Sequence, residues 1–102
     1  MMFAYNITTK VDNSIADEWL RWQKQFHIPG IMNTGLFYEY RIFKLLSQDE
    51  SEGKTFVLQF FVKYREKYDT YIRDYSIIFR EKAFEKWGNA FISFQTLLES
   101  LH

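Results

Sequence analysis

The sequence predicts an α+β fold in which four antiparallel strands form one sheet and two helices cover one face of it. Apolar residues alternate with a period of two, as in strands, over residues 3–11, 36–46, 55–64 and 90–98. They recur at helical spacing over about 14–27 and 66–87. The order is therefore strand, helix, strand, strand, helix, strand. The chain has 102 residues, a length that fits a single domain over residues 1–102.

The first half begins with the strand 3–11, and Asp12-Asn13-Ser14 after it supplies side chains that cap a helix N-terminus. The helix carries an apolar stripe with spacings of four, three and four: Ile15, Trp19, Trp22 and Phe26. We expect it to end near His27, because Pro29 disfavours helical geometry in the residue before it and Gly30 releases the chain.

The second half is a hairpin followed by a helix and a last strand. The acidic segment 47–53 joins the strands 36–46 and 55–64 as the hairpin loop. One face of the second helix is rich in rings: Tyr68, Tyr71, Ile72, Tyr75, Phe79 and Ala83. Gly88 suits the position just after this helix. Right-handed crossovers place both helices on the same side of the sheet, so we predict a ferredoxin-like βαββαβ plait with one open sheet face.

Composition limits the partners that the chain can have. Lys and Arg balance Asp and Glu at 13 each, so no net charge attracts a nucleic acid. The RNA-recognition fold shares the βαββαβ order, but Lys54 stands where its strand motif needs a ring. No apolar run approaches the roughly 20 residues of a membrane span. Without cysteine or a signal-like N-terminus, we expect a cytoplasmic protein with neither a nucleic-acid nor a membrane partner.

Motifs spread along nearly the whole chain resemble one known family. The matching stretches are Tyr5-Asn6-Ile7-Thr8, Glu18-Trp19-Leu20, Trp22, His27-Ile28-Pro29, Thr34-Gly35-Leu36-Phe37, Arg41, Leu45-Leu46, Gln59-Phe60-Phe61, Tyr68, Tyr71, Trp87-Gly88 and Phe94-Gln95-Thr96-Leu97-Leu98-Glu99. On these residues the chain resembles a small bacterial family, domain of unknown function 4286, of the dimeric α/β-barrel group. The resemblance implies this fold and a homodimer formed by the open sheet faces, and it implies no activity.

Polar residues gather on the sheet face that the helices leave open. Alternation turns Gln59 and Phe61 to this face, and the hairpin brings Arg41 beside Gln59. We expect Phe37 and Phe43 to share the face of Arg41. The candidate ligand-binding or interface residues are Asn6, Thr8, Glu39, Arg41, Gln59, Phe61, Phe91, Ser93 and Gln95.

This set has two interpretations. In the first, Arg41 and Gln59 bind the polar or anionic group of a ligand in a cleft walled by Phe61 and Phe91. In the second, Arg41, Glu39 and Gln59 form a satisfied network at a dimer interface, where arginine is enriched. The aromatic content of 21% exceeds what a small two-layer core needs, which fits rings at an interface or in a pocket.

His27 is the candidate catalytic residue, because histidine is the usual general base near neutral pH. The alternative is a structural cation that interacts with the carbonyl groups at a helix C-terminus. The two histidines form no HxH or HExxH pattern, so we expect no metal and no cofactor.

Two functions follow from these residues. The favoured one is a non-catalytic homodimer whose sheet-face cleft binds a small molecule or another partner. The alternative is a cofactor-independent enzyme, a monooxygenase or an isomerase, acting on a small, partly aromatic anionic substrate. In that enzyme, Arg41 would anchor the anionic group and His27 would move protons.

Overall fold

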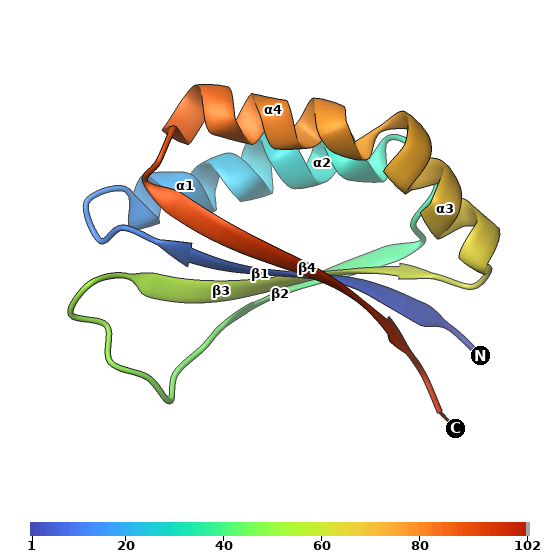
Figure 1. The fold of residues 1–102 in the computed structure, drawn as a ribbon, viewed down its shortest axis with the longest axis horizontal. Helices are drawn as coiled ribbons and strands as arrows, with labels where there is room; N and C mark the ends of the chain where they lie inside the picture. The colour runs from blue at the N-terminus through green and yellow to red at the C-terminus, as the bar shows by residue number, and fades with distance from the viewer. Residues whose placement is uncertain (102) are drawn as a thin grey trace.

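The structure is a computed structural model that describes residues 1–101. It confirms the α+β prediction: four antiparallel strands form a sheet of order β2-β3-β1-β4, and the helices cover one face of it (Figure 1). The strands are β1 (Phe3–Val11), β2 (Glu39–Lys44), β3 (Lys54–Val62) and β4 (Phe91–Glu99). No helix within residues 1–101 is long and apolar enough to cross a membrane.

The helical segment after β1 is longer than the sequence predicts. It runs through α1 (Ala16–Trp22), the π-helical turn η1 (Gln23–His27) and α2 (Ile28–Met32). The prediction that it ends near His27 is wrong. The wider turn is closed by the amide of Ile28, which donates to the carbonyl of Gln23, five residues back. Pro29 then lies in the first turn of α2, directly after this wider turn.

The helical region between β3 and β4 is two helices where the sequence predicts one. They are α3 (Arg65–Asp74) and α4 (Ser76–Trp87), and Tyr75 between them has φ −126° and ψ −32°. The hydroxyl of Ser76 donates to the carbonyl oxygen of Ile72 at 2.8 Å. A hydroxyl bonded to the carbonyl four residues back bends a helix, which accounts for the break at this point.

A core rich in aromatic rings fills the space between the sheet and the helices. Tyr5 lies opposite Phe60 in the β1–β3 register, and both side chains face the helices. Phe37, which the sequence placed on the open face, is only 4% exposed, and its ring lies 5.3 Å from that of Phe60. The placement was wrong because β2 begins only at Glu39, so strand alternation does not reach Phe37.

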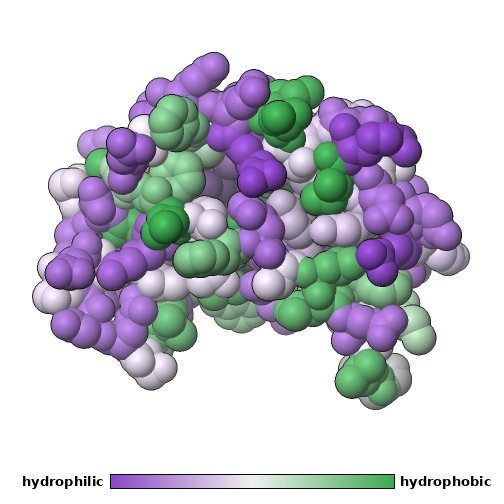
Figure 2. Space-filling model, viewed as in Figure 1, coloured by the Kyte–Doolittle hydropathy of each residue, from purple (hydrophilic) through white to green (hydrophobic). Residues whose placement is uncertain are grey.

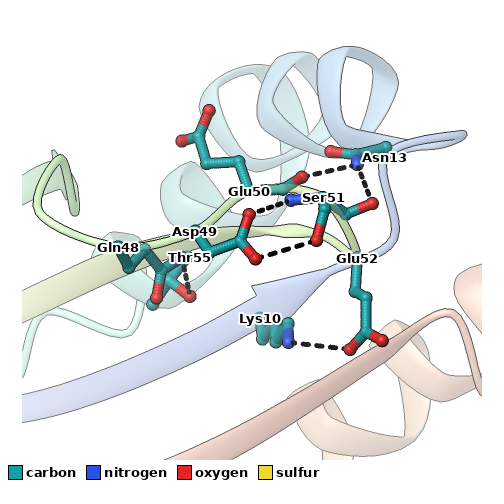
Figure 3. Close-up of polar contacts among 8 residues, drawn as sticks. All are labelled: Lys10, Asn13, Gln48, Asp49, Glu50, Ser51, Glu52 and Thr55. Carbon is teal, nitrogen blue, oxygen red and sulfur yellow. Dashed lines mark hydrogen bonds and ion pairs between the residues drawn. The ribbon is translucent and has the colours of Figure 1, made fainter.

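The hairpin loop between β2 and β3 is tied to the rest of the fold (Figure 3). The side-chain amide of Asn13, beyond β1, donates to the carbonyl oxygens of Glu50 at 2.8 Å and Ser51 at 3.4 Å. Asp49 accepts from the backbone amide of Ser51 at 2.9 Å. A Cβ at Gly53 would lie 2.7 Å from the carbonyl oxygen of Val11, so only glycine fits there. These contacts fix the loop against the N-terminal end of the helical layer.

The open face of the sheet, defined as the face away from the helices, is the underside of the molecule in Figure 1. Figure 2 shows this underside hollowed between two projecting ends. In Figure 1 the hairpin loop and the C-terminal end of the chain occupy these two ends. The open face is therefore concave.

Candidate functional site

A cavity of about 330 Å³, the interlayer cavity, lies between the sheet and the helices. Its floor comes from β1, β3 and β4, and its roof comes from α1, η1, α2, α3 and α4. Rings make up much of its wall: Tyr5, Trp19, Tyr71, Phe79, Phe84 and Phe91. Helix α4 turns the small side chain of Ala83 toward the cavity, which leaves room that a larger residue would fill.

Two polar side chains of the π-helical turn face this cavity without a partner. Gln23 is 4% exposed, and its Oε1 is buried without a hydrogen bond. His27, four residues later, lines the same cavity, and neither ring nitrogen has a partner within residues 1–101. Because buried polar atoms are nearly always hydrogen-bonded, these three atoms mark a place where a further molecule can bind.

His27 is neutral at physiological pH. Burial disfavours the imidazolium, and the positive charge of Lys82 adds to this, so the pKa of His27 falls from 6.5 to about 4. Its ring lies 4.5 Å from Trp22 and 5.8 Å from Phe79, measured between ring centroids. The interpretation as a helix-end cation is wrong, because the helical segment continues to Met32 and the imidazole carries no charge. A role in proton transfer stays a prediction.

The mouth of the cavity carries Arg80, the one charged side chain among its lining residues within 1–101. Burial raises the pKa of the Tyr5 phenol to about 12, and the charge of Arg80 partly opposes this rise. Burial also raises the pKa of Tyr71. Both phenols are therefore neutral at physiological pH, and Arg80 gives the mouth a positive charge.

Three predicted open-face residues lie on the helix side instead. The register pairs Ser93 with Thr9, Gln95 with Ile7, and Phe91 with Val11, so all three line the interlayer cavity. The hydroxyls of Thr9 and Ser93 are hydrogen-bonded at 2.8 Å. The prediction placed these residues on the wrong face. Alternation shows which residues of β4 share a face, but it does not show which of the two faces is turned toward the helices.

The remaining polar candidates do lie together on the open face, where the register aligns Asn6, Gln59 and Arg41 across three strands. Gln59 Nε2 donates to Asn6 Oδ1 at 3.1 Å, and Asn6 Nδ2 donates to Thr8 Oγ1 at 3.3 Å. Arg41 instead pairs with Glu39 at 3.5 Å. The expected network of Arg41, Glu39 and Gln59 is therefore divided: Gln59 bonds to Asn6, and Arg41 pairs with Glu39. Phe61 is on the same face and is 7% exposed.

Sequence reasoning missed Gln23 because it chose the wrong helix face. Phe26 belongs to the predicted apolar stripe, but its side chain is 65% exposed. The buried positions are Ala16, Trp19 and Gln23, with His27 continuing at the same spacing. A glutamine and a histidine in line with a buried tryptophan are the signal that could have located the site.

The model of one protein family, Domain of unknown function (DUF4286), matches residues 2–101. The chain belongs to this family. No curated protein sequence matches the chain at a significant level.

Solved structures share the fold at low sequence identity. An ethyl tert-butyl ether D (EthD) family protein from Bacillus halodurans is 12% identical, with a TM-score of 0.72 over 99% of this chain and 100% of that chain. A dimeric ferredoxin-like protein from an uncultured marine organism is 12% identical, with a TM-score of 0.67 over 99% and 97%. The cofactor-independent oxygenase SnoaB from Streptomyces nogalater is 9% identical, with a TM-score of 0.67 over 99% and 94%.

Proposed function

We propose that this chain binds a small, largely apolar molecule in the interlayer cavity and that two copies pair through their open faces. The observation that carries the binding site is the set of unpartnered buried atoms on Gln23 and His27. The volume of about 330 Å³ is at the lower end for small-molecule pockets, roughly 300–1,000 Å³. A ligand of one or two fused rings is of suitable size.

The polar groups of the cavity support a ligand over a purely structural role. The Thr9 and Ser93 hydroxyls in its floor satisfy each other, as a structural pair would. Gln23 gains no such partner, and burying an amide without one costs about 1–3 kcal/mol. A ligand group that donates to Gln23 Oε1 would recover much of this free energy.

The binding site can be tested with 2-naphthol as the probe, titrated by calorimetry. Ala83→Leu should occupy part of the cavity and weaken binding at least tenfold, while circular dichroism shows the fold retained. Glu81→Leu places the same side chain on an exposed position of α4 and should leave the affinity unchanged. Absence of 2-naphthol binding to the unmodified chain would refute the proposal, as would equal affinities for the unmodified chain and Ala83→Leu.

Apolar side chains that face solvent support pairing through the open face. Phe43, Ile92, Phe94 and Leu98 share this face and are 47%, 56%, 64% and 44% exposed. The face also carries both signs of charge, on Lys10, Glu39 and Arg41, as a self-complementary surface can. The similarity in fold to a dimeric ferredoxin-like protein points the same way.

Dimer formation predicts that light scattering gives twice the chain mass at micromolar concentration. Phe94→Lys should raise the dissociation constant about 30-fold or more, because an aromatic side chain buried at an interface can contribute ~2 kcal/mol. Ile77→Lys, at an exposed position on α4, is the matched control. A monomeric unmodified chain, or a dimer insensitive to Phe94→Lys, would exclude this interface.

A second candidate is a cofactor-independent enzyme in which His27 accepts a proton from the bound molecule. The neutral imidazole favours this role, and the fold is shared with a cofactor-independent oxygenase. The test is exchange of the C1 hydrogen of 2-naphthol in deuterated water. His27 would take the hydroxyl deuteron and deliver it to C1, which gives the keto tautomer. His27 would then take the original C1 proton, and protonation of the oxygen would restore the naphthol with deuterium at C1. His27→Gln should bind 2-naphthol but lose the acceleration. Exchange no faster than in buffer would remove this candidate and leave the binding function intact.

A further inference from the structure

The interlayer cavity has three chemically different zones, which together limit the ligand that it can take. Its inner zone, at η1, carries Gln23 and His27. Its walls are aromatic, and its mouth carries the exposed side chain of Arg80. Each zone selects a different part of the ligand.

In the inner zone, Gln23 Oε1 favours a neutral group that donates a hydrogen bond. Gln23 Oε1 can only accept, so a carboxylate placed against it would bring lone pairs together. Lys82 is close enough to lower the pKa of His27, so a ligand ammonium would meet a repelling charge there. A hydroxyl meets both conditions, because it donates to Gln23 Oε1 and accepts from the N–H of the neutral imidazole.

The walls favour a flat, unsaturated ligand. Trp19 is 1% exposed and stacks on Phe56 at 5.1 Å, so its position is fixed before any ligand binds. In the helical layer, the rings of Tyr71 and Phe79 stack with their centroids 6.2 Å apart, and Phe91 lines the cavity from the sheet. Rings held in this way prefer offset or edge contacts with another ring.

The mouth favours an anionic group. Arg80 forms no ion pair with another residue in the part of the chain described, residues 1–101, and it is the only charged residue lining the cavity there. A guanidinium binds a carboxylate through two parallel hydrogen bonds. An unpaired arginine at the entrance can therefore hold the polar end of a ligand whose body lies inside.

We infer that the ligand is a hydroxylated aromatic carboxylate, with its hydroxyl at Gln23 and His27 and its carboxylate at Arg80. This inference rests on the proposed binding function and makes it more specific. It assigns Gln23 and Arg80 separate tasks at the two ends of one molecule. The two ends can consequently be tested one at a time.

The experiment compares four probes by calorimetry: 6-hydroxy-2-naphthoate, 2-naphthol, 2-naphthoate and 8-hydroxyoctanoate. The first should bind about tenfold more tightly than either naphthalene with one polar group, since one hydrogen bond to a charged or buried group accounts for such a ratio. Arg80→Gln should abolish the advantage of 6-hydroxy-2-naphthoate over 2-naphthol. Gln23→Met should abolish its advantage over 2-naphthoate.

Arg73→Gln is the matched control for charge, because Arg73 is exposed, pairs with Asp74 at 2.9 Å and lies outside the cavity. It should leave all four affinities unchanged. Equal binding of 6-hydroxy-2-naphthoate and 2-naphthol, or an unaltered ratio in Arg80→Gln, would overturn the carboxylate assignment while the binding function stands. Tighter binding of 8-hydroxyoctanoate would overturn the aromatic assignment. Failure of every probe, 2-naphthol included, would refute the binding function itself.

Discussion

The two faces of the sheet treat their polar side chains in opposite ways. On the open face, Gln59, Asn6 and Thr8 form a chain of hydrogen bonds, although water could reach them. At the interlayer cavity, Gln23 Oε1 and both ring nitrogens of His27 are shielded from solvent and have no partner within residues 1–101. Clustered polar residues therefore do not by themselves mark a ligand site. The better indicator is a buried polar atom that the fold leaves unsatisfied.

Apolar side chains also differ between the two faces of the sheet, in how far they are exposed to solvent. Phe94 and Ile92 on the open face are more than half exposed, so a large surface is needed to cover them. The rings around the cavity are already packed against one another, and only a small molecule fits between them. This difference supports the proposal that a second subunit covers the open face and that a ligand occupies the cavity.

The largest expected effect is on the free energy of unfolding, when one aromatic side chain is removed from each region. Trp19→Ala removes a buried indole and should lower the free energy of unfolding by ~3–5 kcal/mol at every protein concentration. Phe94→Ala removes a ring that is 64% exposed and should leave the unfolding of the monomer nearly unchanged. Urea denaturation over a range of protein concentrations separates the two effects.

For a dimer, the unfolding midpoint rises with protein concentration. Phe94→Ala should reduce this dependence, and Trp19→Ala should preserve it while shifting all midpoints downward. Concentration dependence that survives Phe94→Ala would contradict the assignment of the open face to a second subunit.

Acid should destabilise the fold through His27. Its pKa is about 4 in the folded chain and near 6.5 when unfolded, so the unfolded state binds more protons between these values. Stability from this group is complete above pH 6.5 and is lost as the pH falls toward 4, by a total of about 3 kcal/mol. His27→Gln cannot titrate and should lack this component.

Carboxylates also titrate in this range, so the measured quantity is the difference between unmodified chain and His27→Gln. That difference should grow as the pH is lowered from 7 to 4 in urea denaturation series. A constant difference would mean that the imidazole is hydrated or paired in the folded chain, and would remove it from the cavity's unsatisfied groups.

The fold could be predicted from the sequence because its strands alternate cleanly. Residues 3–11 were predicted as a strand and β1 has the same bounds, and β4 differs by one residue at each end. The helical layer was predicted less well. Continuation through Pro29 depends on a π-helical turn, and the break at Tyr75 depends on a local side-chain bond. Neither feature changes the spacing of apolar residues along the sequence, so the sequence pattern does not reveal it.

Only part of the site could be predicted. The hairpin fixed the register of β2 and β3, so Arg41, Gln59 and Glu39 were placed on the correct face. β4 pairs with β1 across a long separation in sequence, and its register assigns Ser93 and Gln95 to the other face. The unpartnered state of Gln23 Oε1 is a property of all the surrounding atoms and could not be deduced from residue types.

The smallest predicted effect is the most direct test of the comparison, because one substitution should act with opposite sign in the two regions. Gln23→Met replaces a buried, unpartnered amide with an apolar side chain of similar length and should stabilise the ligand-free chain by about 1–2 kcal/mol. Gln59→Met removes the donor to Asn6 and should destabilise the chain by about 0.5–1.5 kcal/mol. Urea denaturation of both variants at one protein concentration measures the pair. If Gln23→Met lowered stability as Gln59→Met does, Gln23 would already be satisfied within the fold, and its role as the cavity's acceptor would be lost.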